Sequence, residues 1–263
     1  MIVRPRTCFF ENDPTLALAR RATVEAIGTL LLMFAAVAAS LSMGRYSPDA
    51  SAIGSVANAL VGPGVLVGMI LAFGAVSGGH FNPLITGLQW LGGERSANCT
   101  LAYVGAQLLG ALCGAWLATE ILRAPRLTAL HSGKGWPLLP SEIVATAGLL
   151  LIVQGCARSG RADSGPFGVG LWLSAIAIAV PSSRVNPALT VAALVIPGHM
   201  QLSPRSVLNY LPSQFIGALI AFLVIRAAYP DVQPKAAASS ANLPMSHSER
   251  SADPPPASSK SAP

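Results

Sequence analysis

Long stretches without a single charged side chain dominate this sequence of 263 residues. No Asp, Glu, Lys or Arg occurs within residues 50–93, 96–119, 164–183, 185–204 and 206–225. Apolar runs of about 18 residues or more are long enough to cross a lipid bilayer as a helix. Charged residues make up 11% of the chain, whereas about 25% is usual in a soluble domain. The sequence therefore predicts an all-α membrane protein.

Six of the apolar segments are expected to span the membrane, and two others are too short to do so. The predicted spans lie near residues 21–43, 53–76, 98–122, 140–157, 165–181 and 206–228. The short segments are 82–91 and 186–196. A helix of about ten residues, rising about 1.5 Å per residue, reaches roughly halfway through a bilayer. We therefore expect six transmembrane helices and two re-entrant half-helices.

The two halves of the sequence share three patterns at similar offsets. They are Tyr-x-x-x-Gln-x-x-Gly-Ala at 103–111 and 210–218, Asn-Pro-x-x-Thr at 82–86 and 186–190, and a Glu at 25 and 142. Each half contains three predicted spans, an odd number, so the halves must insert with opposite orientations. Inverted repeats of this kind place the functional site at their interface, near the middle of the membrane. The sequence therefore predicts an inverted 3+3 repeat.

The chain is expected to have a short polar tail at each end of one membrane domain. Residues 1–19 are predicted to form a cytoplasmic tail, and 20–229 the membrane domain, with repeats at about 20–123 and 138–229. Residues 230–263 are rich in Ser, Ala and Pro and are expected to be disordered. With both termini inside, 11 Lys and Arg residues face the cytoplasm and six face outward. This bias favours cytoplasmic termini.

The two Asn-Pro motifs are the candidate centre of function. Pro suits the first turn of a helix and Asn is a good N-cap, so Asn82 and Asn186 should each begin a half-helix. Helix N-termini carry partial positive charge, and two facing ends raise the energy of any cation between them. The Asn amides can donate hydrogen bonds to a passing water or hydroxyl. The pattern indicates a pore for neutral molecules; the alternative is that both residues only cap loops.

Three ionisable residues inside the apolar segments have two interpretations each. Glu25 and Glu142 either form a proton relay or accept hydrogen bonds from the backbone of a re-entrant loop. Their symmetric placement, one in each repeat, favours the loop-holding role. His80, two residues before Asn82, is either a pH-dependent gate or a packing residue, and the packing role is favoured.

Enzyme, metal and nucleic-acid functions find no support in the sequence. The four cysteines show neither a CxxC motif nor metal-ligand spacing, and they are interpreted as small apolar side chains. There is no nucleophile–base pattern, metal cluster or phosphate-binding loop, so we expect no cofactor. The net charge of +6 fits a membrane protein whose basic residues gather in cytoplasmic loops.

These motifs together resemble the major intrinsic protein family, the aquaporins and glycerol facilitators, over about residues 20–228. The resemblance rests on Ser-Gly-Gly-His-Phe-Asn-Pro at 77–83, Asn-Pro-Ala at 186–188, Ala-Gln-x-x-Gly-Ala at 106–111 and the two glutamates. It implies a passive channel in a plasma or bacterial-type inner membrane. It also implies a homotetramer with one pore in each subunit.

The sequence departs from the family pattern at two places. The first motif reads Asn82-Pro83-Leu84, and Leu84 should alter the packing behind the pore only. The second motif, Asn186-Pro187-Ala188, is followed by Leu189 where the family normally has an Arg at the outer constriction. The other constriction positions, carried over by spacing from the two Asn residues, are Gly62, Ser174 and Ser183.

The predicted filter of Gly62, Ser174, Ser183 and Leu189 would form a wide and weakly polar mouth. It resembles family members that pass larger neutral solutes, such as glycerol-like polyols or undissociated metalloid acids, together with water. Arg184 has two interpretations. It supplies the missing guanidinium from a neighbouring position, or it points to a loop carbonyl or to the external interface.

Three other functions remain as alternatives. One is a water-selective aquaporin, and another is a proton-coupled transporter that uses Glu25 and Glu142. The third is a structural membrane protein without conductance. Uphill transport driven by a pH gradient would indicate coupling, and the absence of any flux would indicate a structural role.

Overall fold

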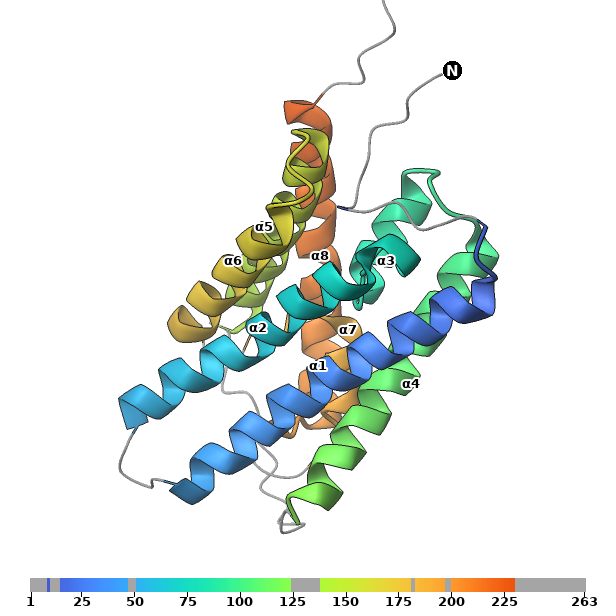
Figure 1. Ribbon diagram of the computed structural model, residues 1–263. Helices are drawn as coiled ribbons and strands as arrows, with labels where there is room; N and C mark the ends of the chain where they lie inside the picture. Colours follow the sequence, from blue (N-terminus) through green and yellow to red (C-terminus); the bar gives the residue numbers. More distant parts are fainter. Residues whose placement is uncertain are drawn as a thin grey trace, which may run out of the picture. The chain divides into compact units, whose positions relative to one another are not determined.

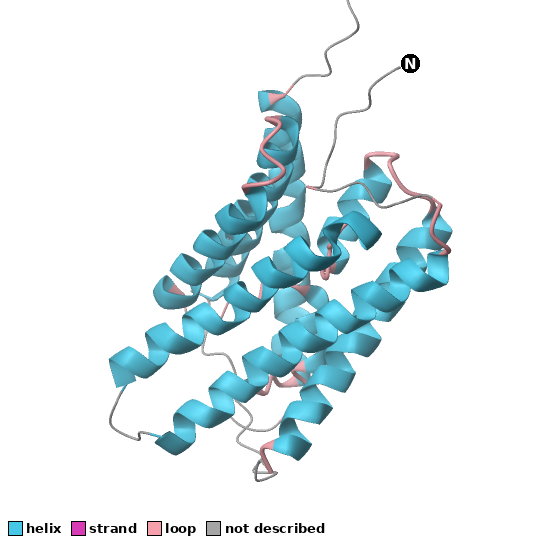
Figure 2. Cartoon of the chain, in the orientation of Figure 1, coloured by secondary structure: helices cyan, strands magenta, loops and turns pink. Residues whose placement is uncertain are grey.

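The computed structural model describes residue 9 and residues 15–46, 51–123, 138–180, 183–196 and 200–229. The described residues form eight α-helices, which short loops connect (Figures 1 and 2). They are α1 (Leu18–Tyr46), α2 (Ser51–Ser77), α3 (Pro83–Leu91), α4 (Ala97–Ile121), α5 (Leu138–Arg158), α6 (Gly165–Ala179), α7 (Pro187–Ala192) and α8 (Pro204–Ala228). The predicted C-terminal tail, 230–263, lies outside the described residues, as does most of the predicted N-terminal tail.

Five of the described helices are long and apolar enough to cross a membrane, namely α1, α2, α4, α5 and α8. The sixth predicted span corresponds to α6, an apolar helix of 15 residues that ends two residues before the predicted limit. Its predicted end, 181, falls on Pro181, which lies outside the described residues. The predicted all-α fold, with six spans and two half-helices, is confirmed.

The second half-helix is shorter than the sequence predicts. Helix α7 covers Pro187–Ala192, six residues, whereas the predicted segment was 186–196. Beyond it, Leu194 N donates to Val191 O and Val195 N donates to Ala192 O, so the chain continues in tighter turns. The sequence places Pro197 next, and a residue before proline disfavours the α conformation. The first half-helix, α3, has the predicted length.

Small residues bring two pairs of helices together at equivalent places in the two repeats. Helix α1 packs along α4, and α5 packs along α8. A methyl group added at Gly110 of α4 would overlap the carbonyl oxygen of Ala26, and one at Gly217 of α8 would lie 2.6 Å from that of Ile143. Glycine at these positions therefore permits the close approach of backbones that is common between membrane helices.

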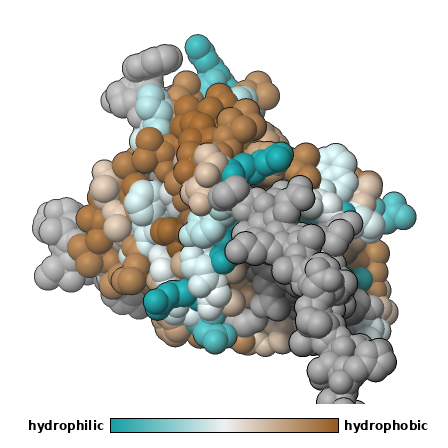
Figure 3. Space-filling view, turned by 90° about the horizontal axis from the view of Figure 1, so that it is seen from above, coloured by the Kyte–Doolittle hydropathy of each residue, from teal (hydrophilic) through white to brown (hydrophobic). Residues whose placement is uncertain are grey.

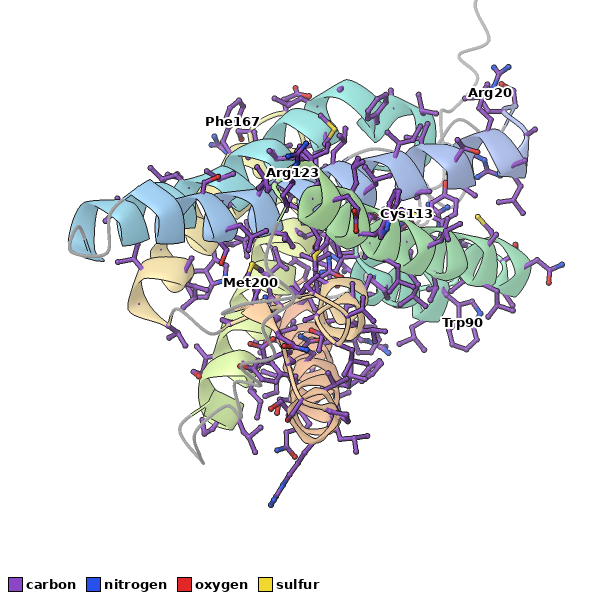
Figure 4. The ribbon with its side chains drawn as sticks, turned by 90° about the horizontal axis from the view of Figure 1, so that it is seen from below. Arg20, Trp90, Cys113, Arg123, Phe167 and Met200 are labelled. Carbon is purple, nitrogen blue, oxygen red and sulfur yellow. The ribbon has the colours of Figure 1, made fainter. Side chains whose placement is uncertain are left out.

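Burial is reversed relative to a water-soluble protein. Apolar side chains are exposed along the outer faces of the helices and cover much of the surface in Figure 3. Trp90 and Phe167, which are 49% and 53% exposed, point away from the bundle in Figure 4. Meanwhile Glu25, Gln107 and Gln214 are fully buried. Polar residues inside and apolar residues outside suit a lipid environment.

Candidate pore

Each Asn-Pro motif begins a half-helix in the same way. The Asn82 side chain is the N-cap of α3, where its Oδ1 accepts from Leu84 N at 2.9 Å. Asn186 is the N-cap of α7, where its Oδ1 accepts from Ala188 N at 3.0 Å. In both helices Pro occupies the first turn, where its missing N–H leaves no hydrogen bond unmade.

The two motifs are also hydrogen-bonded to each other. Asn82 Nδ2 donates to the carbonyl oxygen of Val185 at 2.9 Å, and Asn186 Nδ2 donates to that of Phe81 at 2.8 Å. A carboxamide nitrogen carries two hydrogens, so each Asn retains a second N–H for another acceptor. Both side chains are 4% exposed. The half-helix N-termini therefore meet at a point where two amide donors and two positive helix ends converge.

Both carbonyl groups in this exchange belong to residues with left-handed backbone. Phe81 has φ of 48° and Val185 has φ of 49°. This region is uncommon for residues other than glycine, especially β-branched ones, and costs about 1–3 kcal/mol for each residue. The same conformation occurs at the same place in both repeats, immediately before the Asn. The strain is therefore a repeated feature of the contact between the two loops.

The Glu25 carboxylate binds the loop that precedes α3. Its oxygens accept from Ser77 Oγ at 2.6 Å, His80 N at 3.0 Å, Phe81 N at 2.7 Å and Gln107 Nε2 at 2.8 Å. Two of these donors are backbone N–H groups of the non-helical loop. An ionised carboxylate is purely an acceptor and matches this set of donors. Glu25 thus links α1 to the first loop and to α4.

Glu142 makes the same contacts in the second repeat. It accepts from Ser183 Oγ at 2.8 Å, Arg184 N at 3.0 Å, Val185 N at 2.7 Å and Gln214 Nε2 at 2.7 Å. The two serines are not at equivalent positions, because Ser77 lies five residues before its Asn and Ser183 lies three before. The same bond has therefore been reached from different sites in the two loops.

His80 is enclosed by hydrogen bonds on both ring nitrogens. Its Nδ1 lies 2.9 Å from Thr86 Oγ1, and its Nε2 lies 3.4 Å from Arg95 Nη2. Thr86 Oγ1 accepts from Gln107 Nε2 at 3.0 Å and donates to Asn82 O at 3.2 Å. Because Arg95 is only a donor, His80 Nε2 must accept, and the proton then lies on Nδ1. The ring is 1% exposed and fits this network as neutral imidazole.

Arg95 is a buried member of this cluster that the sequence did not single out. Its guanidinium donates to Gln89 Oε1 at 2.8 Å and to Cys99 Sγ at 3.1 Å, and it lies 4.4 Å from the centre of the Tyr103 ring. A lone Arg in a loop between apolar segments is usually interpreted as a cytoplasmic charge. No local pattern indicates that this one turns inward, although its spacing of four residues from Cys99 places both at the start of α4.

The four predicted filter positions lie on different elements. Gly62 lies in α2 and Ser174 in α6, and a methyl group added at Gly62 would meet no atom within 4 Å. Leu189, in α7, is partly buried and packs against both apolar core clusters. The Ser183 hydroxyl donates to Glu142, so its oxygen is left only as an acceptor. Leu84 of the first motif is 3% exposed and belongs to the core.

Arg184 directs its guanidinium to a loop carbonyl. Its Nη2 donates to Met200 O at 2.9 Å, while its backbone N–H is held by Glu142. This contact is one of the two arrangements that the sequence left open. Leu189, where the family would place an Arg, and Arg184 therefore belong to the same loop and half-helix but point to different surroundings.

Comparison with known proteins identifies the family. Residues 14–184 match the family model described as Major intrinsic protein. The chain is 30% identical over 211 residues to Aquaglyceroporin AqpS of Rhizobium meliloti (strain 1021), covering 80% of this chain and 90% of that protein. It is 31% identical over 196 residues to Aquaporin Z of Photorhabdus laumondii, covering 67% and 84%.

A solved structure shows the same fold. The X-ray structure of the aquaglyceroporin from Plasmodium falciparum superimposes with a TM-score of 0.64 at 18% sequence identity, covering 82% of this chain and 97% of that one. At this identity the likeness concerns the fold alone. Since the family match spans more than half of the sequence, the chain belongs to the major intrinsic protein family and is a multi-pass membrane channel for water or small solutes, not an enzyme.

Proposed function

We propose that the channel passes neutral solutes of glycerol size, including undissociated metalloid acids such as arsenous acid, together with water. The observation that carries this proposal is Leu189 at the outer constriction. Leucine brings neither the charge nor the five N–H donors of the usual Arg. The printed name of the similar Rhizobium meliloti protein, an aquaglyceroporin, supports the same class of solute.

The pathway is proposed to run between the two Asn-Pro motifs. Asn82 and Asn186 each keep one amide hydrogen that is not used in the contact between the loops. These donors can replace hydrogen bonds that a hydroxylated solute gives up on leaving water. The facing helix ends oppose cations at the same point. Neutral molecules with hydroxyl oxygens fit this combination.

The outer mouth is proposed to be lined by Gly62, Ser174, Ser183 and Leu189. Gly62 adds no side chain and has open space beside it. Ser183 offers an acceptor oxygen, because its hydrogen is donated to Glu142. Such a ring is wide and weakly polar, which favours bulkier neutral solutes over strict selection of water.

The contacts of the two glutamates argue against proton coupling. All four donors to Glu25, like those to Glu142, belong to the loop or to the adjacent helix. Each carboxylate therefore serves as an anchor for non-helical backbone at membrane depth. A water-selective aquaporin is the closest competing function, and solute flux distinguishes it.

We also propose the assembly and orientation that the family resemblance implies. The channel domain is taken as 20–229, with both termini cytoplasmic, in a plasma or inner membrane. The subunits are proposed to form a homotetramer in which each has its own pore. The excess of basic residues on the side of the termini supports this orientation.

Stopped-flow light scattering on proteoliposomes tests the proposed function. The native channel should pass water, glycerol, urea and undissociated arsenous acid. Leu189→Arg should lower the glycerol and arsenous acid fluxes more than the water flux. Leu122→Arg, which adds the same charge at the outer end of α4, is the control and should have no such effect. A native channel that passes water and excludes glycerol and arsenous acid would contradict the proposal.

A further inference from the structure

Arg184 occupies the position in the second repeat that His80 occupies in the first. Each lies two residues before its Asn. Each donates its backbone N–H to the Glu of its own repeat, at 3.0 Å in both cases. The two repeats are inverted, so these equivalent positions lie on opposite sides of the Asn pair. His80 is on the side of α3, and Arg184 is on the side of α7.

The two side chains have very different surroundings. His80 is 1% exposed and both of its ring nitrogens have partners. Arg184 is only partly buried, although it lies deep among protein atoms. Its Nη2 bonds Met200 O, and its Nε is buried without a hydrogen bond. Its Nη1 is absent from the buried atoms that lack a partner and has no hydrogen bond of its own. This nitrogen is therefore accessible to solvent.

Accessibility deep within a protein indicates an internal, water-filled space. Figure 4 shows Met200, the anchor of Arg184, between the helices of the first repeat and those of the second, inward of the periphery where Trp90 and Phe167 lie. Arg184 also precedes Val185, whose carbonyl oxygen accepts from Asn82. The guanidinium is thus attached to the loop that forms one side of the central contact.

We propose that Arg184 is the cation-repelling group of the outer half of the pore, and that it takes over the electrostatic role of the Arg that Leu189 replaces. The inference rests on the proposed function, because it requires the pathway to pass the second loop. Held at the wall by the Met200 carbonyl, the guanidinium contributes a fixed positive charge without narrowing the ring at Leu189. The mouth is then wide for neutral solutes and still unfavourable for cations.

Nearby groups leave this charge available to the pathway. Glu142 is the acidic side chain in electrostatic range of Arg184, and Tyr210 is the other titratable neighbour. The Glu142 carboxylate is occupied by four donors, and only the backbone N–H of Arg184 is among them. The guanidinium itself bonds a neutral carbonyl, so its charge is not neutralised by a direct ion pair.

Removing the charge tests the proposal. Arg184→Gln, Arg184→Lys and the native channel are reconstituted, and proton and K⁺ leak under a membrane potential is divided by the water flux of the same vesicles. Arg184→Gln should raise this ratio by about tenfold or more, because a fixed charge at the mouth is a main barrier to cations. Arg184→Lys should stay near the native ratio. Arg205→Gln, which removes an exposed charge at the start of α8, is the matched control and should also stay near it.

A second measurement covers the case in which Arg184→Gln carries no water flux. Arg184→Cys is made in a background with the native cysteines replaced by Ser, and is exposed to a cationic methanethiosulfonate reagent from outside. It should react about tenfold faster than Ala192→Cys, a fully buried position in α7. Equal protection of both, or an unchanged leak ratio in Arg184→Gln, would overturn the inference. Neither result depends on whether glycerol permeates, which decides the proposed function separately.

Discussion

Asn82 Nδ2 donates a hydrogen bond of 2.9 Å to the carbonyl oxygen of Val185, a residue from the other repeat. The reciprocal bond joins Asn186 and Phe81 at 2.8 Å. Each Asn is thus positioned by its own half-helix through Oδ1 and by the opposite loop through Nδ2. The orientation of the remaining amide hydrogens depends on both repeats at once.

Asn186→Asp should damage the centre of the pore. The substitution replaces the donor to Phe81 O with a carboxylate oxygen, which leaves the carbonyl without its partner at a cost of about 1–3 kcal/mol. It also places negative charge where two positive helix ends meet. We expect the flux of neutral solutes to fall and cation leak to rise. Asn209→Asp, at an exposed position in α8, is the control. Native flux and native ion exclusion in Asn186→Asp would remove these motifs from the pathway.

Glu25→Gln should mainly lower stability. The amide nitrogen of Gln would face groups that are all donors, and hydrogen bonds to a charged group contribute about 1.5–3 kcal/mol each. We expect the thermal midpoint in detergent to fall by several degrees, whereas Glu120→Gln, at an exposed position, should leave it unchanged. Glycerol flux through the folded fraction should be retained. Uphill accumulation of solute driven by a pH gradient, abolished by Glu25→Gln, would instead establish proton coupling.

Gly110→Ala should separate α1 from α4. The added methyl group would overlap the carbonyl oxygen of Ala26, and both helices are too well packed to move without losing contacts. Gly105→Ala is a matched control in the same helix, because a methyl group there meets nothing within 4 Å. This control should be neutral, or stabilising by up to about 1 kcal/mol. Thermal melts of both variants provide the measurement, and equal midpoints would contradict the close contact.

Flux through the native channel should not change between about pH 5 and pH 8 on account of His80. Protonation of Nε2 would place two donors face to face, since Arg95 Nη2 already points at this atom. Arg95→Gln removes the opposing charge and should allow His80 to titrate, which would make flux depend on pH. The double variant with His80→Asn should lose that dependence. A native flux that already changes near pH 6 and loses the change in His80→Asn would show that the ring is a gate.

The repeated patterns allowed most of the fold to be predicted, because apolar length and duplication are properties of the sequence itself. The length of α7 was not predictable from apolarity, since 186–196 remains apolar after the helix has ended. The network around His80 was also out of reach. Arg95 resembles any basic loop residue, and only the folded chain shows that it turns toward Tyr103. Likewise, the bonds of Ser77 and Ser183 to the glutamates do not follow the repeat spacing.

The exchange of hydrogen bonds between the two loops has a consequence for biosynthesis. When the first three spans have emerged from the ribosome, the carbonyl oxygen that receives the Asn82 amide has not yet been synthesised, since Val185 follows 103 positions later. The first loop must therefore remain incomplete within the membrane until the second arrives. The channel opens only once its last helices are in place, which protects the cell from half-built pores.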